Sequence, residues 1–320
     1  MNELLNVEAL AFDKRISERI SNGFIPDLQK LKFNSYFYKS FWRDPLYADC
    51  FVGEMFRNFL KNFKKYIPNQ GRILDMGCGS GYFSLELARN GYNVVGIDIS
   101  NECIESAKHT LKLNKDTQNF GSLNYYVGSE EKLESLGKFD GILSSGFLHH
   151  CLNVEKTLEM LYEQIQPEGI IVMHEPQHNY FNEKDALVVG SIRELLARGN
   201  LWLESPKPLN TDVDFKKLSN EVKLEFTFER DVKEEDGQSP NDLSCDRDQI
   251  LNEVKKKMFL VEDYPSASFI YRILGGLRGN KKVNKSLALF LTNLDKYYVD
   301  NKIINANYFY AVAKKKNKEI

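Results

Sequence analysis

The stretch that most constrains this chain is residues 72–84, RILDMGCGSGYFS, in which three glycines fall within five positions. A short apolar run precedes the glycines, and good helix formers with helical spacing follow them. The pattern predicts a strand, a tight turn and the first turn of a helix. Glycines in such a turn let the backbone bend sharply and let a ligand approach the amides at the helix N-terminus.

A second landmark follows at residues 93–98, NVVGID, which predict a buried parallel strand that ends in Asp98. Asp98 lies seventeen residues after Gly81. An acid about 20 residues beyond the glycines, at the tip of the next strand, is placed to accept hydrogen bonds from ribose hydroxyls. The alternative role for Asp98 is to cap the following helix, but Ser100 is available for that role. The two segments predict a nucleoside site where the strand order reverses.

The spacing of the glycines restricts the class of ligand that the predicted site could bind. Gly77, Gly79 and Gly81 form the pattern GxGxG. The dinucleotide fingerprint is GxGxxG, and its third glycine lets helix and strand pack closely. This chain has Tyr82 at that later position.

The segment resembles motif I of the class I S-adenosylmethionine-dependent methyltransferases, in which an acid precedes the glycines as Asp75 does here. The resemblance continues in order through Asp98, FDGIL at 139–143 and PEGIIV at 167–172. It covers residues 73–175 and implies S-adenosylmethionine as the cofactor. A tight turn alone would explain the glycines but not the ordered set.

Strand and helix patterns alternate at the spacing of βαβ units. The first predicted strands are 73–76, 94–97, 124–127, 141–144 and 170–174, and the helices between them are 80–90, 101–113, 130–136 and 154–164. The pattern resumes with a helix at 247–257, a strand at 258–261, a helix at 285–298 and a strand at 307–313. Such alternation predicts an α/β, doubly wound parallel sheet. The resemblance implies a Rossmann-like seven-stranded sheet whose antiparallel last strand lies beside strand five.

The remaining segments are expected to flank the cofactor-binding part. Residues 1–66 are predicted to form an N-terminal helical and aromatic cap, with helices at 7–20 and 48–67 and six aromatic residues within 33–45. The aromatic segment either forms a lid over the nucleoside pocket or packs the N-terminal helices onto the core. The Rossmann-like domain takes residues 67–176 and 246–316, and residues 177–245 form an insertion that shapes the acceptor site. The insertion is expected to be helical over 181–197, then polar and irregular, with a solvated acidic loop at 229–237.

The resemblance also implies roles for single residues. Asp98 is assigned to the ribose, and Asp75 to the ammonium of the methionine end, although an Asp here also stabilises turns. The further cofactor-binding residues are Gly77, Cys78, Gly79, Gly81, Ile99, Ser129, Glu130 and Ser145. Ile99 is expected to pack on the adenine. Ser129 stands where the family often has an Asp for the adenine amino group, so Ser129 or Glu130 takes that contact.

The histidines are concentrated near the expected reaction centre. His149, His150, His174 and His178 follow predicted strands four and five. Ligands bind beyond the carboxyl ends of such strands, and histidine titrates near neutral pH. We therefore expect His150, His174 or His149 to act as a general base, the alternative being local packing. A metal site is not expected, because hard cations need carboxylates and these histidines lack the spacing of a transition-metal site.

Composition restricts the class of protein. The formal net charge of −2 disfavours a nucleic-acid partner. The five scattered cysteines show no CxxC pair, so neither a disulfide framework nor structural zinc is expected, and a reducing cytoplasm fits. The N-terminus carries acids where a signal peptide carries lysines, and no apolar run is long enough for a membrane span.

These features predict a cytoplasmic methyltransferase that acts on a small or medium organic acceptor, with no membrane partner. The acceptor atom and the oligomeric state are left open. Three rivals are a nicotinamide-dependent oxidoreductase, an inactive cofactor-binding scaffold and an RNA methyltransferase. The glycine spacing disfavours the first. The third lacks an NPPY-like base-flipping motif, since SSGF stands at 144–147.

Overall fold

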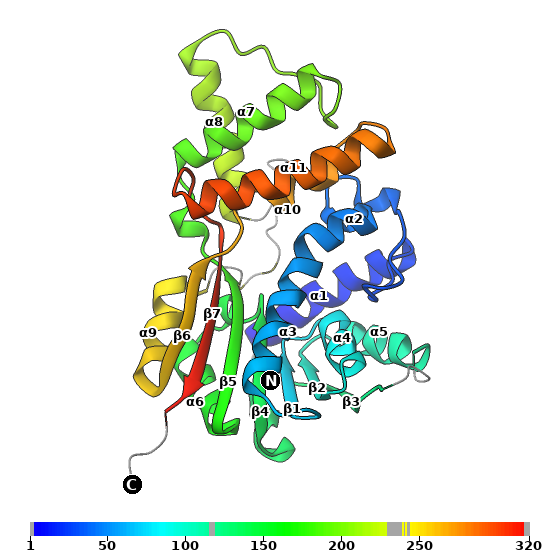
Figure 1. Ribbon diagram of the computed structural model, residues 1–320, viewed down its shortest axis with the longest axis vertical. Helices are drawn as coiled ribbons and strands as arrows, with labels where there is room; N and C mark the ends of the chain where they lie inside the picture. The colour runs from blue at the N-terminus through cyan, green and yellow to red at the C-terminus, as the bar shows by residue number, and fades with distance from the viewer. Residues whose placement is uncertain (1–2, 115–118, 229–238, 240, 242–243, 317–320) are drawn as a thin grey trace.

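The computed structural model describes residues 3–114, 119–228, 239, 241 and 244–316. Seven strands within these ranges form one sheet in the order β3-β2-β1-β4-β5-β7-β6 (Figure 1). The strands are β1 (Arg72–Met76), β2 (Asn93–Asp98), β3 (Leu123–Val127), β4 (Phe139–Ser145), β5 (Ile165–Pro176), β6 (Met258–Pro265) and β7 (Tyr308–Lys315). The first five pair in parallel, whereas β7 pairs antiparallel with β5 and β6. The predicted fold class is confirmed.

Helices cover both faces of the sheet because successive strand residues point to opposite sides. Ile73 belongs to a core with Phe63 and Phe83, whereas the next residue, Leu74, belongs to a core with Leu158 and Ile250. The helices of the first core are α3 (Glu54–Tyr66), α4 (Tyr82–Arg89) and α5 (Asn101–Lys112), and those of the second are α6 (Val154–Gln164) and α9 (Arg247–Lys257).

A further group of helices lies beyond the end at which β5 finishes (Figure 1). It contains α7 (Glu183–Arg198), α8 (Asp212–Phe228), α10 (Ile270–Ile273) and α11 (Lys281–Asp300). The expectation of an irregular segment after residue 197 is wrong over α8. Leu218, Val222 and Phe226 are all buried there at helical spacing, and this apolar face outweighs the polar composition. The acidic segment 229–237 lies outside the described residues.

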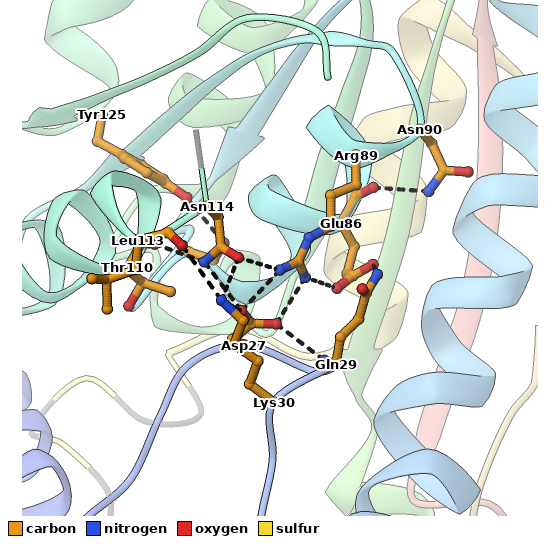
Figure 2. A network of polar contacts seen from close by, with 11 residues as sticks. Asp27, Gln29, Lys30, Glu86, Arg89, Asn90, Thr110, Leu113, Asn114 and Tyr125 are labelled. Carbon is orange, nitrogen blue, oxygen red and sulfur yellow. Dashed lines mark hydrogen bonds and ion pairs between the residues drawn. The ribbon is translucent and has the colours of Figure 1, made fainter. Parts of the chain in front are cut away.

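The N-terminal segment contains α1 (Glu3–Ser21), the short turns η1 (Ser35–Phe37) and η2 (Phe41–Arg43), α2 (Pro45–Ala48) and the π-helical turn η3 (Asp49–Gly53). A polar network fixes this segment to the sheet helices (Figure 2). Arg89 of α4 donates to both carboxylate oxygens of the fully buried Asp27, at 2.8 Å each. Arg89 also binds Glu86, and Asn114 donates to Asp27 at 3.1 Å. The N-terminal segment is therefore anchored by buried charged groups.

The helix predicted at residues 130–136 is found with the same bounds. Residues 130–136 form a 3₁₀ helix, η4 (Glu130–Leu136), rather than an α-helix. No side-chain hydrogen bond from Ser129 caps this segment, and Gly137 at φ 72° ends it. The division of the chain into cap, central domain and insertion stays a prediction.

Candidate functional site

The turn that follows β1 lies at the switch point of the sheet, because β1 pairs with β2 on one side and β4 on the other. Gly77 and Gly79 have φ of 71° and 52°. A side-chain carbon at Gly77 would meet Phe147 at 2.7 Å, whereas one at Gly79 would enter open space. Gly77 is thus required for close packing, and Gly79 leaves its backbone open to a ligand.

Asp98 ends β2 beside this turn. Its Oδ2 accepts from the Gly79 amide at 2.8 Å, and its Oδ1 accepts from the Ser100 amide at 2.9 Å. Ser100, not Asp98, caps α5, since its hydroxyl accepts from the Cys103 amide at 3.0 Å. Burial raises the pKa of Asp98 despite the two amide bonds.

We call the hollow beside the turn the glycine-loop cavity; its volume is about 400 Å³. The predicted cofactor residues that line it are Asp75, Gly77, Cys78, Gly79, Asp98, Ile99, Ser129, Glu130 and Ser145. Gly81 does not line it; this residue is the N-cap of α4 at φ 78°, and a side-chain carbon there would meet the Tyr125 hydroxyl at 2.4 Å. Asp75 accepts from the Ser84 hydroxyl at 2.5 Å, and burial raises the pKa of Asp75 to about 7.

One face of α1 also lines the glycine-loop cavity, and the sequence analysis missed it. The residues are Leu5, Glu8, Phe12, Arg15, Ile16 and Arg19. Their spacing of mostly three or four positions was the available signal, because it places all six on one side of a helix. Glu8 lies 3.0 Å from Nδ1 of His150.

A second hollow, the aromatic cavity, has a volume of about 440 Å³. Its aromatic lining consists of Phe12, Phe41, Trp42, Phe51, Tyr82, Trp202, Tyr271 and Tyr308. It shares seven lining residues with the glycine-loop cavity: Phe12, Arg15, Arg19, Tyr82, Ser145, Gly146 and His150. The two cavities therefore adjoin, with α1 and Tyr82 at the boundary.

His149 lines the aromatic cavity and is held by Glu175, whose importance was also missed. Nδ1 of His149 lies 2.8 Å from Oε2 of Glu175, which is fully buried. Ser144 donates its hydroxyl to Oε1 of Glu175 at 2.8 Å, and the amides of Phe147 and Leu148 donate to the same oxygen at 3.1 Å each. Burial acts to raise the pKa of Glu175, but the His149 contact and these amides outweigh it and lower the pKa.

The other two histidines are placed differently. His174 stacks on Tyr308 at 5.0 Å, and its Nε2 lies 3.0 Å from the Ser266 hydroxyl. Burial lowers the pKa of His174 to about 4. His150 lines both cavities, and its Nδ1 lies 3.1 Å from the Ser239 hydroxyl. The three sequence candidates thus meet around the aromatic cavity in unequal electrostatic settings.

The described residues contain no group of three His, Cys, Asp or Glu side chains arranged to hold a metal ion. Within the same part of the chain, no helix combines the length and the apolar character needed to cross a membrane.

Comparison with known proteins identifies methyltransferases that are similar to this chain. The chain is 34% identical over 119 residues to the ubiquinone biosynthesis O-methyltransferase of Pelagibacter ubique, a match that spans 36% of this chain and 47% of that protein. It is 30% identical over 130 residues to the protein of the same name from Agrobacterium fabrum, across 40% of this chain and 50% of that one. The chain thus spans about half the length of these relatives.

The solved structure of the 4+2 cyclase SpnF aligns with a TM-score of 0.52 at 12% identity, across 98% of this chain and 97% of that one. This likeness concerns the fold only. Residues 49–210, half of the chain, match the family of the methyltransferase domain. The chain therefore belongs to the methyltransferase-domain family, within the class I S-adenosylmethionine-dependent superfamily that its glycine motif resembles.

Proposed function

We propose that this protein transfers a methyl group from S-adenosylmethionine to a hydroxyl of a small or medium organic acceptor. The observation that carries the proposal is the pair of adjoining cavities. One is built on the glycine turn and Asp98, and the other has aromatic walls and the Glu175–His149 pair. Such a pair suits a donor and an acceptor that must meet at a shared boundary.

The glycine-loop cavity suits the donor. Gly79 leaves open space at its backbone, and the Asp98 carboxylate lies at the strand tip where ribose hydroxyls are bound in related folds. Asp75 would hold the ammonium of the methionine end, and Ile99 with Ser129 or Glu130 would contact the adenine. The donor, when bound, supplies a methyl group already activated by its sulfonium charge.

The protein would contribute alignment, exclusion of water and a base. His149 would accept the acceptor's hydroxyl proton at Nε2, because Glu175 engages Nδ1 and fixes the tautomer. The Glu175 carboxylate would also stabilise the imidazolium that forms. His174 suits this role less well, since a pKa of about 4 makes it a weak base at neutral pH. His174 would instead form part of the cavity wall.

The names of the relatives favour oxygen as the methylated atom, since both are O-methyltransferases. A cofactor-binding protein that transfers no methyl group is the second candidate, because SpnF, which shares the fold, is named as a cyclase and not as a methyltransferase. A scaffold would not require a histidine that a buried carboxylate orients. The buried Glu175 therefore favours a catalyst.

Calorimetry with S-adenosylhomocysteine and with NAD tests the donor assignment. We expect S-adenosylhomocysteine to bind and NAD not to bind. Asp98→Asn should weaken S-adenosylhomocysteine by roughly 10- to 100-fold, because it removes charged hydrogen bonds worth about 1.5–3 kcal/mol. Asp300→Asn, an equal change at the end of α11, should leave the affinity unchanged. The donor assignment is wrong if the unaltered protein gives no heat, or if Asp98→Asn binds equally well.

A further inference from the structure

Two neighbouring histidines of the short turn η5 (Leu148–His150) each face a different buried carboxylate. The ring centroids of His149 and His150 are 4.0 Å apart. Nδ1 of His149 lies 2.8 Å from Glu175, and Nδ1 of His150 lies 3.0 Å from Glu8 of α1. Glu175 is fully buried, and Glu8 is 2% exposed. The proposed base therefore belongs to a cluster of two imidazoles and two carboxylates.

The carboxylate of Glu8 is ionised at neutral pH. Burial acts to raise the pKa of Glu8, but His150, the Ser239 hydroxyl and the Asn241 amide outweigh burial and lower the pKa. The Asn241 amide donates to Oε2 of Glu8 at 3.0 Å, whereas Oε1 faces His150. An ionised carboxylate in contact with an imidazole stabilises the protonated ring.

The two rings are close enough for a proton on one to oppose a proton on the other. Their side chains are only 4% and 12% exposed, so water screens this repulsion weakly. Two such groups titrate as a pair, and the first proton goes to the ring that is better stabilised. Glu8 therefore competes with Glu175 for the position of that proton.

Further charged or titratable groups surround the pair and contribute to the same balance. Within the described residues they include Arg15 and Arg19 of α1, Asp98 of β2, His174 of β5 and Cys245. A substitution of Glu8 leaves all of these groups in place, so the contribution of Glu8 can be measured by itself.

We infer that Glu8 is a positioning residue for the proton transfer: it holds the shared proton on His150, so that Nε2 of His149 is free to accept the proton of the acceptor hydroxyl. This inference rests on the proposed function, in which His149 is the base. During transfer the methyl group leaves the donor sulfur and bonds to the acceptor oxygen, and the hydroxyl proton moves to His149. The sulfonium loses its positive charge as His149 gains one, so the net charge of the site is unchanged. Each imidazolium then faces a carboxylate of its own.

The position of Glu8 links this proton to the helix that covers the site. α1 lines both cavities, and it is fixed beside the donor cavity by Asp13. Asp13 accepts from the Ser100 hydroxyl at 2.5 Å and from the Glu102 amide at 3.0 Å. Glu8 reaches His150 only while α1 lies over the cavities, so His149 is a free base in the covered state.

Nitrogen-15 NMR of the histidine rings measures this arrangement directly. The labelled protein is titrated with acid, with and without S-adenosylhomocysteine, and His149→Gln and His150→Gln assign the signals. The comparison is made at the pH where His149 of the unaltered protein is half protonated. Glu8→Gln should raise the ratio of protonated to neutral His149 about tenfold, because the proton moves over from His150. Glu175→Gln should lower this ratio, and Glu3→Gln, the same change on an exposed α1 residue that lines neither cavity, should leave it unchanged.

The His150→Gln background tests whether Glu8 acts through His150. Glu8 can then affect His149 only as a nearby negative charge, which favours the protonated ring. Adding Glu8→Gln to His150→Gln should therefore leave the protonation of His149 unchanged or lower it. A rise in both backgrounds would mean that Glu8 acts by another route, and the inference would be overturned.

A single Glu8→Gln variant in which His149 is protonated equally or less also overturns the inference. The proposed function is decided by a separate measurement, because the histidine titration requires neither donor nor acceptor. If S-adenosylhomocysteine gives no heat in calorimetry, the proposed function falls, and Glu8 has no proton transfer to assist. If S-adenosylhomocysteine binds and the titration shows no transfer of the proton to His149, only the inference falls.

Discussion

The proposed chemistry depends most on Glu175, whose carboxylate is buried. We expect both His149→Gln and Glu175→Gln to lower kcat by roughly 10²- to 10⁴-fold, the usual contribution of a positioned base. Glu175 acts through His149, so Glu175→Gln should also shift the acid limb of the pH–rate profile to lower pH. The pH dependence of kcat at saturating acceptor checks this.

A control separates chemistry from folding. His109→Gln changes a histidine on α5 that lines neither cavity, and turnover should be unaffected. The affinity for S-adenosylhomocysteine should survive in all three variants, because neither His149 nor Glu175 lines the glycine-loop cavity. Undiminished kcat in His149→Gln and Glu175→Gln would contradict the assignment of the base.

Asp75 should make donor binding depend on pH. Burial raises the pKa of Asp75 to about 7, so half of the free protein carries a neutral Asp75 near that pH. A bound ammonium favours the ionised carboxylate, so binding should release a proton and tighten as the pH rises. We expect the Kd of S-adenosylhomocysteine to fall up to about tenfold between pH 6 and pH 8.

Calorimetry in two buffers of different ionisation enthalpy measures the released proton directly. Asp75→Asn cannot ionise, so its affinity should be nearly constant across this range. An unaltered protein that binds without proton release near pH 7 would show that Asp75 does not contact the ammonium.

Among the elements, the N-terminal segment depends on the Asp27–Arg89 pair (Figure 2). Arg89→Met should lower the free energy of unfolding by about 3–5 kcal/mol, because it removes the guanidinium that pairs with the buried Asp27 carboxylate at 2.8 Å. Arg57→Met removes an exposed pair with Asp49 and should cost about 1 kcal/mol or less. Urea denaturation compares the two, and equal losses would refute the anchoring role of Arg89.

The same pair predicts acid sensitivity. Burial acts to raise the pKa of Asp27, but Arg89 outweighs it and lowers the pKa below its ordinary value. A lowered folded pKa means that the stabilisation is complete above the unfolded pKa, about 4. The stabilisation is lost as the pH falls through the folded pKa. Below about pH 4 the difference between Arg89→Met and the unaltered protein should therefore shrink.

At the scale of the whole molecule, α1 closes one side of both cavities but buries little of itself. Its buried residues are Glu8, Ala9 and Ile16 only. Such a helix is expected to open more readily than the sheet, and a ligand beneath it should hold it in place. We expect S-adenosylhomocysteine to slow amide hydrogen exchange in α1.

Exchange in α9, which packs on the second core and lines neither cavity, provides the comparison within the same molecule. Equal slowing in α1 and α9 would indicate general stabilisation rather than closure of α1. Unchanged exchange in α1 would mean that this helix does not contact the donor.

The sequence by itself determined the sheet and the position of Asp98 beside the glycine turn. The glycine turn, Asp98 and the capping Ser100 are neighbours along the chain, and strand and helix periods are local patterns, so their places follow from spacing. The same reasoning failed at α8, where a buried face outweighed a polar composition.

Only the tertiary structure decided which residues line the aromatic cavity. Arg19, His149 and Arg272 meet in one cavity although more than a hundred residues separate each from the next. The three histidine candidates looked equivalent in the sequence, but burial lowers the pKa of His174 to about 4, whereas His149 contacts the buried carboxylate of Glu175. Spacing along the chain predicts which face of a helix or strand a residue occupies. The charges and the solvent exposure around that residue depend on segments distant in the sequence, which only folding brings together.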